Sequence, residues 1–190
     1  MNSLTLSLTN MENLPNDMSN MSKLRRLILL ECFHVVKMES TFYNFQNLGY
    51  LKFAGCHLLD ELPHLHNLKS LRQLEIIDCP KVRKFPKEFG HKGAFPVLEI
   101  FSLAWLPMLE ELPLIEEGAM ASLQIFTMMA CTTLNILPKK LYESQNSSKN
   151  KNLWLSCKKF RSSRKHHCEG SDNVYCRHKR NCKEILTILE

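Results

Sequence analysis

The chain has 190 residues, of which 44% are hydrophobic, enough for one extended folded domain. No run approaches the roughly 18 consecutive apolar residues that a membrane-spanning helix needs. The N-terminus lacks the basic start and long apolar run of a secretory signal, so we expect a cytoplasmic protein without a membrane span. The formal net charge of +6 is uneven, because residues 1–144 carry a net −1 and residues 145–190 a net +7. The basic character therefore belongs to the C-terminal segment.

A short apolar phrase recurs five times between residues 24 and 138. Each copy has a Leu at position i, apolar residues at i+3 and i+5, and usually Cys at i+8. Further apolar residues lie at i+11 and i+14, and four copies have Pro at i+15. The copies begin at Leu24, Leu48, Leu71, Leu98 and Leu123, in steps of 24, 23, 27 and 25 residues. This spacing is typical of leucine-rich repeats, in which each copy forms one coil of a solenoid.

The repeat predicts one short strand in each coil. Residues i+3 and i+5 of a strand point to the same side, and both are apolar in every copy, so this side faces the interior. We therefore expect an α/β repeat solenoid, a leucine-rich-repeat arc with a parallel β-sheet on its concave face. Its return segments should be irregular or short helices, because Pro at i+15 interrupts regular structure. Met1, Leu4 and Leu6 indicate a sixth, degraded copy, and Leu153–Leu155 a possible last strand.

The chain divides into three parts by composition. Residues 1–142 form the predicted repeat domain, 143–156 a polar linker with the possible last strand, and 157–190 a basic Cys/His tail that we expect to be disordered. Because the degraded copy starts at the first residue, we expect a fragment of a longer repeat array, with a self-capping first coil as the alternative. Four repeat cysteines occupy the i+8 slot, and we expect them to be reduced and structural.

The outward positions i+2, i+4, i+6 and i+7 should line the concave face and offer a surface for a protein partner. The i+6 column is apolar in every copy, and contiguous exposed apolar surface marks interaction sites. Arg, Tyr and Trp are enriched in binding hot spots. The candidate protein-binding residues are Arg26, Leu30, Tyr50, Lys52, Glu75, Ile77, Asp78, Ile100, Trp105 and Met129.

Two stretches resemble plant intracellular nucleotide-binding, leucine-rich-repeat disease-resistance proteins. They are LRQLEIIDCPKVRKFP, which ends at Pro86, and the run from Phe95 to Pro138. The resemblance covers about residues 1–140 and concerns only the C-terminal repeat region of that family. It implies a protein-recognition module of an innate-immune receptor. Such a module would bind a pathogen effector, a host target or the receptor's own nucleotide-binding domain, and would contribute to defence signalling and autoinhibition.

The chain departs from that family in one respect that concerns chemistry. It lacks a Gly-x-x-x-x-Gly-Lys-Ser/Thr phosphate-binding loop, so we expect no nucleotide, no other cofactor and no ATPase activity. It also lacks the common catalytic and metal-binding motifs, so we expect neither an enzyme nor a metal site.

Two other function classes remain open. The first is a general leucine-rich-repeat adaptor, such as the substrate-binding subunit of a ubiquitin ligase. The second, weaker class is zinc or nucleic-acid binding through the tail, although nucleic acid is an unlikely partner. The tail's potential zinc ligands are His166, His167, Cys168, Cys176, His178 and Cys182. Their intervals are longer than the Cys-x2–4-Cys spacing that structural zinc sites favour.

Overall fold

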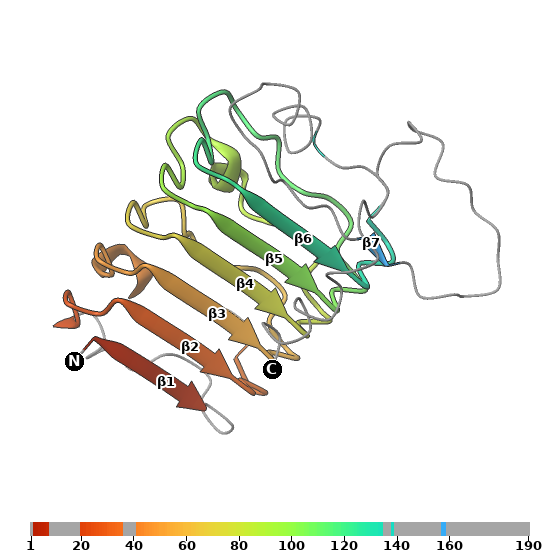
Figure 1. Ribbon diagram of the computed structural model, residues 1–190. Helices are drawn as coiled ribbons and strands as arrows, with labels where there is room; N and C mark the ends of the chain where they lie inside the picture. The colour runs from red at the N-terminus through yellow and green to blue at the C-terminus, as the bar shows by residue number, and fades with distance from the viewer. Residues whose placement is uncertain (1, 8–19, 36–40, 135–137, 139–156, 159–190) are drawn as a thin grey trace, which may run out of the picture.

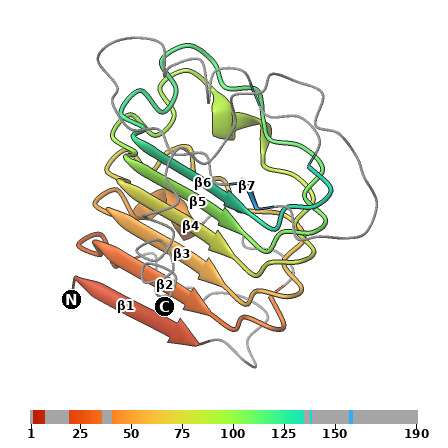
Figure 2. The ribbon, with the colours of Figure 1, turned by 45° about the vertical axis from the view of Figure 1, so that its right-hand side comes forward.

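The computed structural model describes residues 2–7, 20–35, 41–134, 138, 157 and 158. These residues form a seven-stranded parallel sheet in which the strands follow one another in sequence order (Figure 1). The strands are β1 (Ser3–Ser7), β2 (Arg26–Leu30), β3 (Tyr50–Ala54), β4 (Gln73–Ile77), β5 (Ile100–Ala104), β6 (Ile125–Met129) and β7 (Cys157–Lys158). The described parts of the connections between β2 and β6 return on the same side of the sheet, so the chain winds as a solenoid (Figure 2). The predicted leucine-rich-repeat solenoid is confirmed.

The strand register keeps equivalent repeat positions in rows across the sheet. Leu27 pairs with Leu51, Leu51 with Leu74, and Leu74 with Phe101, all at i+3. These side chains are buried, as are the i+5 residues, so each row forms a layer of the interior. The described residues at i+11 and i+14 are buried as well and close the core from the return side: Val35, Leu59, Leu62, Val82, Phe85, Leu109, Leu112 and Leu134.

Backbone hydrogen bonds extend the ladder beyond both ends of the strands. At the start, the carbonyl oxygen of Gly49 accepts from the N–H groups of Arg72 and Gln73, at 2.8 and 3.0 Å. At the end, Trp105 N–H donates to the Met129 oxygen at 2.9 Å. Equivalent bonds join most neighbouring coils. These bonds therefore satisfy backbone N–H and C=O groups that would otherwise have no hydrogen-bond partner where each coil turns away from the sheet.

The return segments contain little regular structure. Two 3₁₀ helices occur, η2 (Thr41–Asn44) and η3 (Lys87–Gly90), and the described residues include no α-helix. Pro86, in the i+15 slot, immediately precedes η3. Phenylalanine rings fill the space between these segments and the sheet, with Phe89 4.6 Å from Phe95 and Phe101 5.4 Å from Phe126 between ring centroids. This agrees with the predicted irregular or short helical return segments.

The five coils that contain β2 to β6 each leave the sheet through one residue in the left-handed conformation. This residue is at i+7, with φ between 50° and 70°: Glu31, Gly55, Asp78, Trp105 and Ala130. The left-handed region costs a non-glycine residue roughly 1–2 kcal/mol. Its recurrence in five coils indicates that the inter-coil hydrogen bonds hold this turn. The turn directs the i+7 side chains along the C-terminal edge of the sheet.

The i+8 cysteines form a row beneath this turn. Cys32, Cys56 and Cys79 are buried, Cys131 is half-buried, and the four side chains are reduced thiols. Three of them donate to the i+6 carbonyl of their own coil, as Cys79 does to the Ile77 oxygen at 3.5 Å. The expectation of reduced cysteines inside the repeats agrees with this arrangement.

The two ends of the sheet differ from the central coils. The degraded first copy forms β1, where Leu4 and Leu6 face inward but are only partly buried. A seventh strand exists at Cys157–Lys158, which pairs with Met128 and Met129. It thus begins at the first residue that we assigned to the tail, and the expected strand Leu153–Leu155 lies outside the described residues. The other proposed domain boundaries stay predictions.

Candidate functional site

The outward side of the sheet, here called the sheet face, carries the candidate binding residues. It consists of the i+2, i+4, i+6 and i+7 columns. Seven of the ten candidates lie on β2 to β5 within the strands, Met129 ends β6, and Asp78 and Trp105 are the left-handed residues that follow β4 and β5. Arg26, Asp78 and Trp105 are exposed, and Leu30, Tyr50, Lys52, Ile77, Ile100 and Met129 are half-buried. Glu75 alone among the ten is buried.

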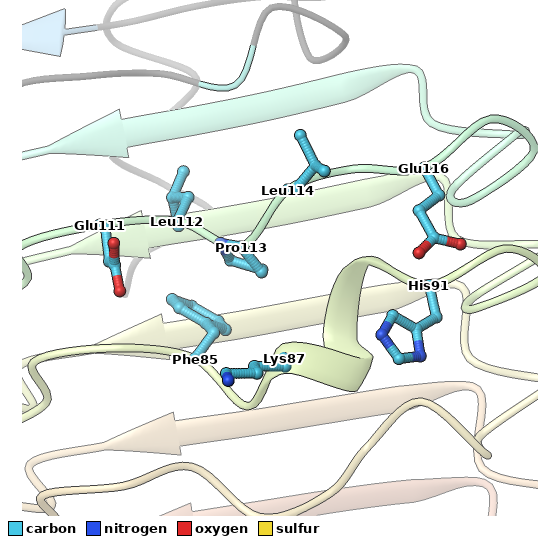
Figure 3. A pocket seen from close by; sticks show the side chains of 8 residues that line it. All are labelled: Phe85, Lys87, His91, Glu111, Leu112, Pro113, Leu114 and Glu116. Atoms are coloured by element: carbon cyan, nitrogen blue, oxygen red, sulfur yellow. The ribbon is translucent and has the colours of Figure 1, made fainter.

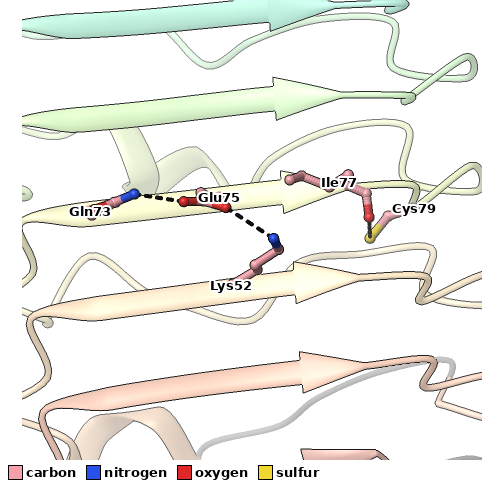
Figure 4. Close-up of polar contacts among 5 residues, drawn as sticks. All are labelled: Lys52, Gln73, Glu75, Ile77 and Cys79. Carbon is pink, nitrogen blue, oxygen red and sulfur yellow. Dashed lines mark hydrogen bonds and ion pairs between the residues drawn. The ribbon is translucent and has the colours of Figure 1, made fainter. Parts of the chain in front are cut away.

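Glu75 is the centre of a polar network on the sheet face (Figure 4). Its side chain is only 1% exposed, and Lys52 from the neighbouring strand is 14% exposed. The Lys52 Nζ lies 3.4 Å from Glu75 Oε2, and Gln73 Nε2 donates to Oε1 at 2.6 Å. Oε2 receives no hydrogen bond of good directional geometry, so its contact with the ammonium is mainly electrostatic. Removal of either partner would leave a charge in a poorly solvated place.

Tyr50 and Arg26 extend this network toward solvent. The Arg26 guanidinium carbon lies 3.8 Å from the centroid of the Tyr50 ring, a cation–π contact. Burial, together with the nearby Glu75 carboxylate, raises the pKa of Tyr50 to about 12, against the opposing effect of Arg26. Tyr50 therefore stays a neutral hydroxyl group at physiological pH. One continuous polar cluster therefore extends across three strands and consists of Arg26, Tyr50, Lys52 and Glu75.

The opposite edge of the sheet face carries aromatic and acidic groups. His57 Nε2 lies 3.0 Å from Asp78 Oδ2, and the Phe33 ring packs on His57 at 5.1 Å between centroids. Trp105 follows in the next coil and is 47% exposed, although large aromatic residues are usually covered. An exposed Trp near half-buried Ile77 and Met129, which end the neighbouring strands β4 and β6, offers the kind of anchor found in protein interfaces.

The return side offers a shallow hollow of about 290 Å³ between two coils (Figure 3). It is lined by Phe85, Lys87, His91, Glu111, Leu112, Pro113, Leu114 and Glu116. The volume is at the lower limit for small-molecule sites, which are usually deep and mostly apolar. Charged groups of both signs line it, and the 80% exposed Leu114 projects from its rim. The hollow does not have the form of a cofactor or substrate pocket.

Metal ligands do not gather in the described part of the chain, where no group of three His, Cys, Asp or Glu residues could hold an ion. His64 instead pairs with Glu88, with 3.5 Å between Nδ1 and Oε2. Burial lowers the pKa of the neighbouring His66, which favours its neutral form. The tail residues that could bind zinc or nucleic acid lie outside the described residues.

Of the helices that the structure describes, none has the length and hydropathy to cross a bilayer.

The sequence is similar to parts of plant disease-resistance proteins. It is 41% identical over 70 residues to Disease resistance protein RPP5 of Arabidopsis thaliana, and 36% identical over 70 residues to Disease resistance protein RPP4. It is 32% identical over 139 residues to Protein SUPPRESSOR OF npr1-1, CONSTITUTIVE 1 of the same plant. These matches cover 37%, 37% and 71% of this chain but only 5%, 6% and 9% of the relatives. No family model matches the chain.

Together, the repeat solenoid and these similarities describe a leucine-rich-repeat region that resembles those of plant disease-resistance proteins. The longest match covers 71% of the chain, so the similarity extends well beyond a single repeat. The chain spans less than a tenth of the length of these curated relatives.

Proposed function

We propose that this chain is a protein-recognition module of a plant innate-immune receptor. In this role the sheet face binds a pathogen-derived protein or a modified host protein. In the absence of that ligand, the same region contacts the receptor's own nucleotide-binding domain and stabilises the inactive state. Ligand binding then shifts the population toward the active state, because the ligand binds one state better than the other. The module has no catalytic step and works in the cytoplasm.

The observation that supports this proposal most is the exposed aromatic and apolar surface of the sheet face. Trp105 is 47% exposed, and half-buried Ile77 and Met129 end the neighbouring strands β4 and β6. Such residue types form the centre of protein interfaces, where they are desolvated by the partner. The similarity to disease-resistance proteins supplies the biological setting. A ubiquitin-ligase adaptor would use the same surface, but no similarity reported above favours that alternative.

The proposal is tested by affinity purification from plant leaves, with and without infection, followed by mass spectrometry. The sheet-face variant Ile77→Glu/Met129→Glu should lose a specific partner that the wild-type chain retains, because two carboxylates would then have to be desolvated in the interface. Leu114→Glu is the matched control, since Leu114 is exposed on the return side. Circular dichroism must show that all three proteins are equally folded. Equal recovery of the partner by the sheet-face variant would contradict the proposal.

A further inference from the structure

The i+2 column of the sheet face changes in character from one end to the other. From β2 onward it carries Arg26, Tyr50 and Gln73, and in the last two full strands it carries Ile100 and Ile125. One end is therefore cationic and aromatic, and the other is aliphatic. A surface graded in this way fits a ligand with a negative charge at one end and an apolar group at the other.

At the cationic end, the positive charge of Arg26 is not compensated by an ion pair within the described part of the chain. Lys52 and Glu75 neutralise each other at 3.4 Å, and Arg72 and Arg83 pair with Glu99 and Glu110. Among the residues that the structure describes, no carboxylate lies within ion-pair distance of Arg26.

The contact with Tyr50 restricts the Arg26 side chain to a position in which it could bind a carboxylate ligand. The Arg26 guanidinium carbon lies 3.8 Å from the centroid of the Tyr50 ring, and the Arg26 side chain remains exposed. A guanidinium binds a carboxylate in a bidentate manner through its N–H groups. Stacking also restricts the side chain in advance, which lowers the entropy that binding would otherwise cost.

The distance between the two ends sets the spacing of the ligand groups. Neighbouring strands are about 4.8 Å apart, so the three steps from Arg26 to Ile100 span roughly 14 Å. An extended peptide rises about 3.4 Å per residue and covers this distance in about four residues. The ligand motif would therefore be an acidic residue with an apolar residue about four positions away.

We propose that the i+2 column binds an extended segment of a protein partner that carries this acidic-x-x-x-apolar pattern. Arg26 binds the carboxylate and Ile100 with Ile125 covers the apolar side chain. This inference rests on the proposed recognition function of the sheet face and specifies the chemistry of its partner.

The probe is an acetylated, amidated seven-residue peptide with Asp at its second and Leu at its sixth position, and Ser or Gly elsewhere. Binding to the full chain is followed by NMR titration at low salt, with the backbone amide signals of Tyr50 and Ile100, present in every variant, as reporters. We expect millimolar or tighter binding, weakened at least fivefold when Asn replaces Asp, when Ser replaces Leu, or in Arg26→Gln. Arg72→Gln is the control, because Arg72 is exposed but already paired with Glu99.

Three results of the titration would overturn the inference. They are equal affinities for the Asp and Asn peptides, an equal loss in the Arg72→Gln variant, and no binding at millimolar peptide. A self-associated wild-type chain that dissociates in Arg26→Gln, seen by analytical ultracentrifugation, would assign the column to a second copy and also overturn it. If a natural partner requires Ile77 but binds Arg26→Gln normally, the recognition function stands and only this inference fails.

Discussion

Gly90 should be the glycine least tolerant of replacement, because the backbone of the next coil passes directly over it. A Cβ atom at Gly90 would lie 1.9 Å from the Leu114 carbonyl oxygen, whereas real Cβ contacts shorter than 3.0 Å essentially never occur. Gly90→Ala therefore requires the two coils to separate by about 1 Å. That shift disturbs the buried ring of Phe89 and the bond from Glu116 N–H to the Gly90 oxygen, 2.8 Å long.

The expected loss can be estimated from these two contributions. Overpacking of a filled site costs about 1–3 kcal/mol, and the weakened hydrogen bond adds about 1 kcal/mol. We therefore expect Gly90→Ala to lower the free energy of unfolding by about 2–4 kcal/mol. The assay is urea denaturation followed by circular dichroism, with the midpoint as the primary measurement.

Two other glycines provide matched controls that separate crowding from backbone strain. Gly93 has φ of +75° but open space around its Cβ position, so Gly93→Ala should cost only about 1–2 kcal/mol. Gly49 would place a Cβ at ordinary contact distance, 3.6 Å from the Arg25 oxygen, and Gly49→Ala should change the midpoint little. A Gly90→Ala variant as stable as Gly49→Ala would refute the close inter-coil packing described here.

Three further predictions concern the sheet face. Lys52→Met should destabilise the fold by about 2–3 kcal/mol in urea denaturation, because it leaves Glu75 buried without a cation. The Lys52→Met/Glu75→Gln double variant should recover more than half of that loss. No recovery would argue against a stabilising ion pair between Lys52 and Glu75. The raised pKa of Tyr50 contributes stability that is complete below pH 10 and is lost as the pH rises toward 12. Tyr50→Phe should reduce this decline in the free energy of unfolding with pH. An unchanged decline would contradict the raised pKa of Tyr50. Trp105→Ala should weaken partner binding by more than about 1 kcal/mol in calorimetry with little change in melting temperature, and unchanged affinity would remove Trp105 from the interface.

The strand positions could be predicted from the sequence because burial imposes them in every coil. Alternating apolar residues at i+3 and i+5 specify the inner side of each strand, and five copies in one register define the sheet. Even the degraded copy with Leu4 and Leu6 formed the expected strand, β1. The reduced cysteines at i+8 could also be predicted from the small buried slot that they occupy.

The left-handed turn at i+7 could not be predicted from residue types. Only Gly55 signals such a conformation. Glu31, Asp78 and Trp105 adopt it because their N–H groups donate to carbonyl groups of the next coil, and Ala130 has the same conformation. A second kind of left-handed turn, in the return segments, has a recognisable sequence pattern. Gly93-Ala94-Phe95 and Gly118-Ala119-Met120 repeat a Gly-Ala-x pattern, and both have left-handed first and third residues.

The burial of Glu75 also depended on neighbours that are distant in sequence. An outward strand position predicts an exposed carboxylate, and we placed Glu75 among the direct contact residues. Its cover comes from Lys52 and Tyr50, one coil away, and from Gln73 beside it. We now expect Glu75 to hold its neighbours in place for binding. Single-sequence reasoning identifies the columns of this surface, but the side-chain network within them requires the three-dimensional register.

The central claim is that this solenoid recognises a protein partner through its sheet face. The most direct measurement is site-specific photo-crosslinking in plant cells, with benzoylphenylalanine introduced either at Ile77 on the sheet face or at Leu114 on the return side. The account predicts one discrete crosslinked protein from position 77 and no corresponding product from position 114. Crosslinks of the same protein at equal yield from both positions, or from position 114 alone, would contradict it.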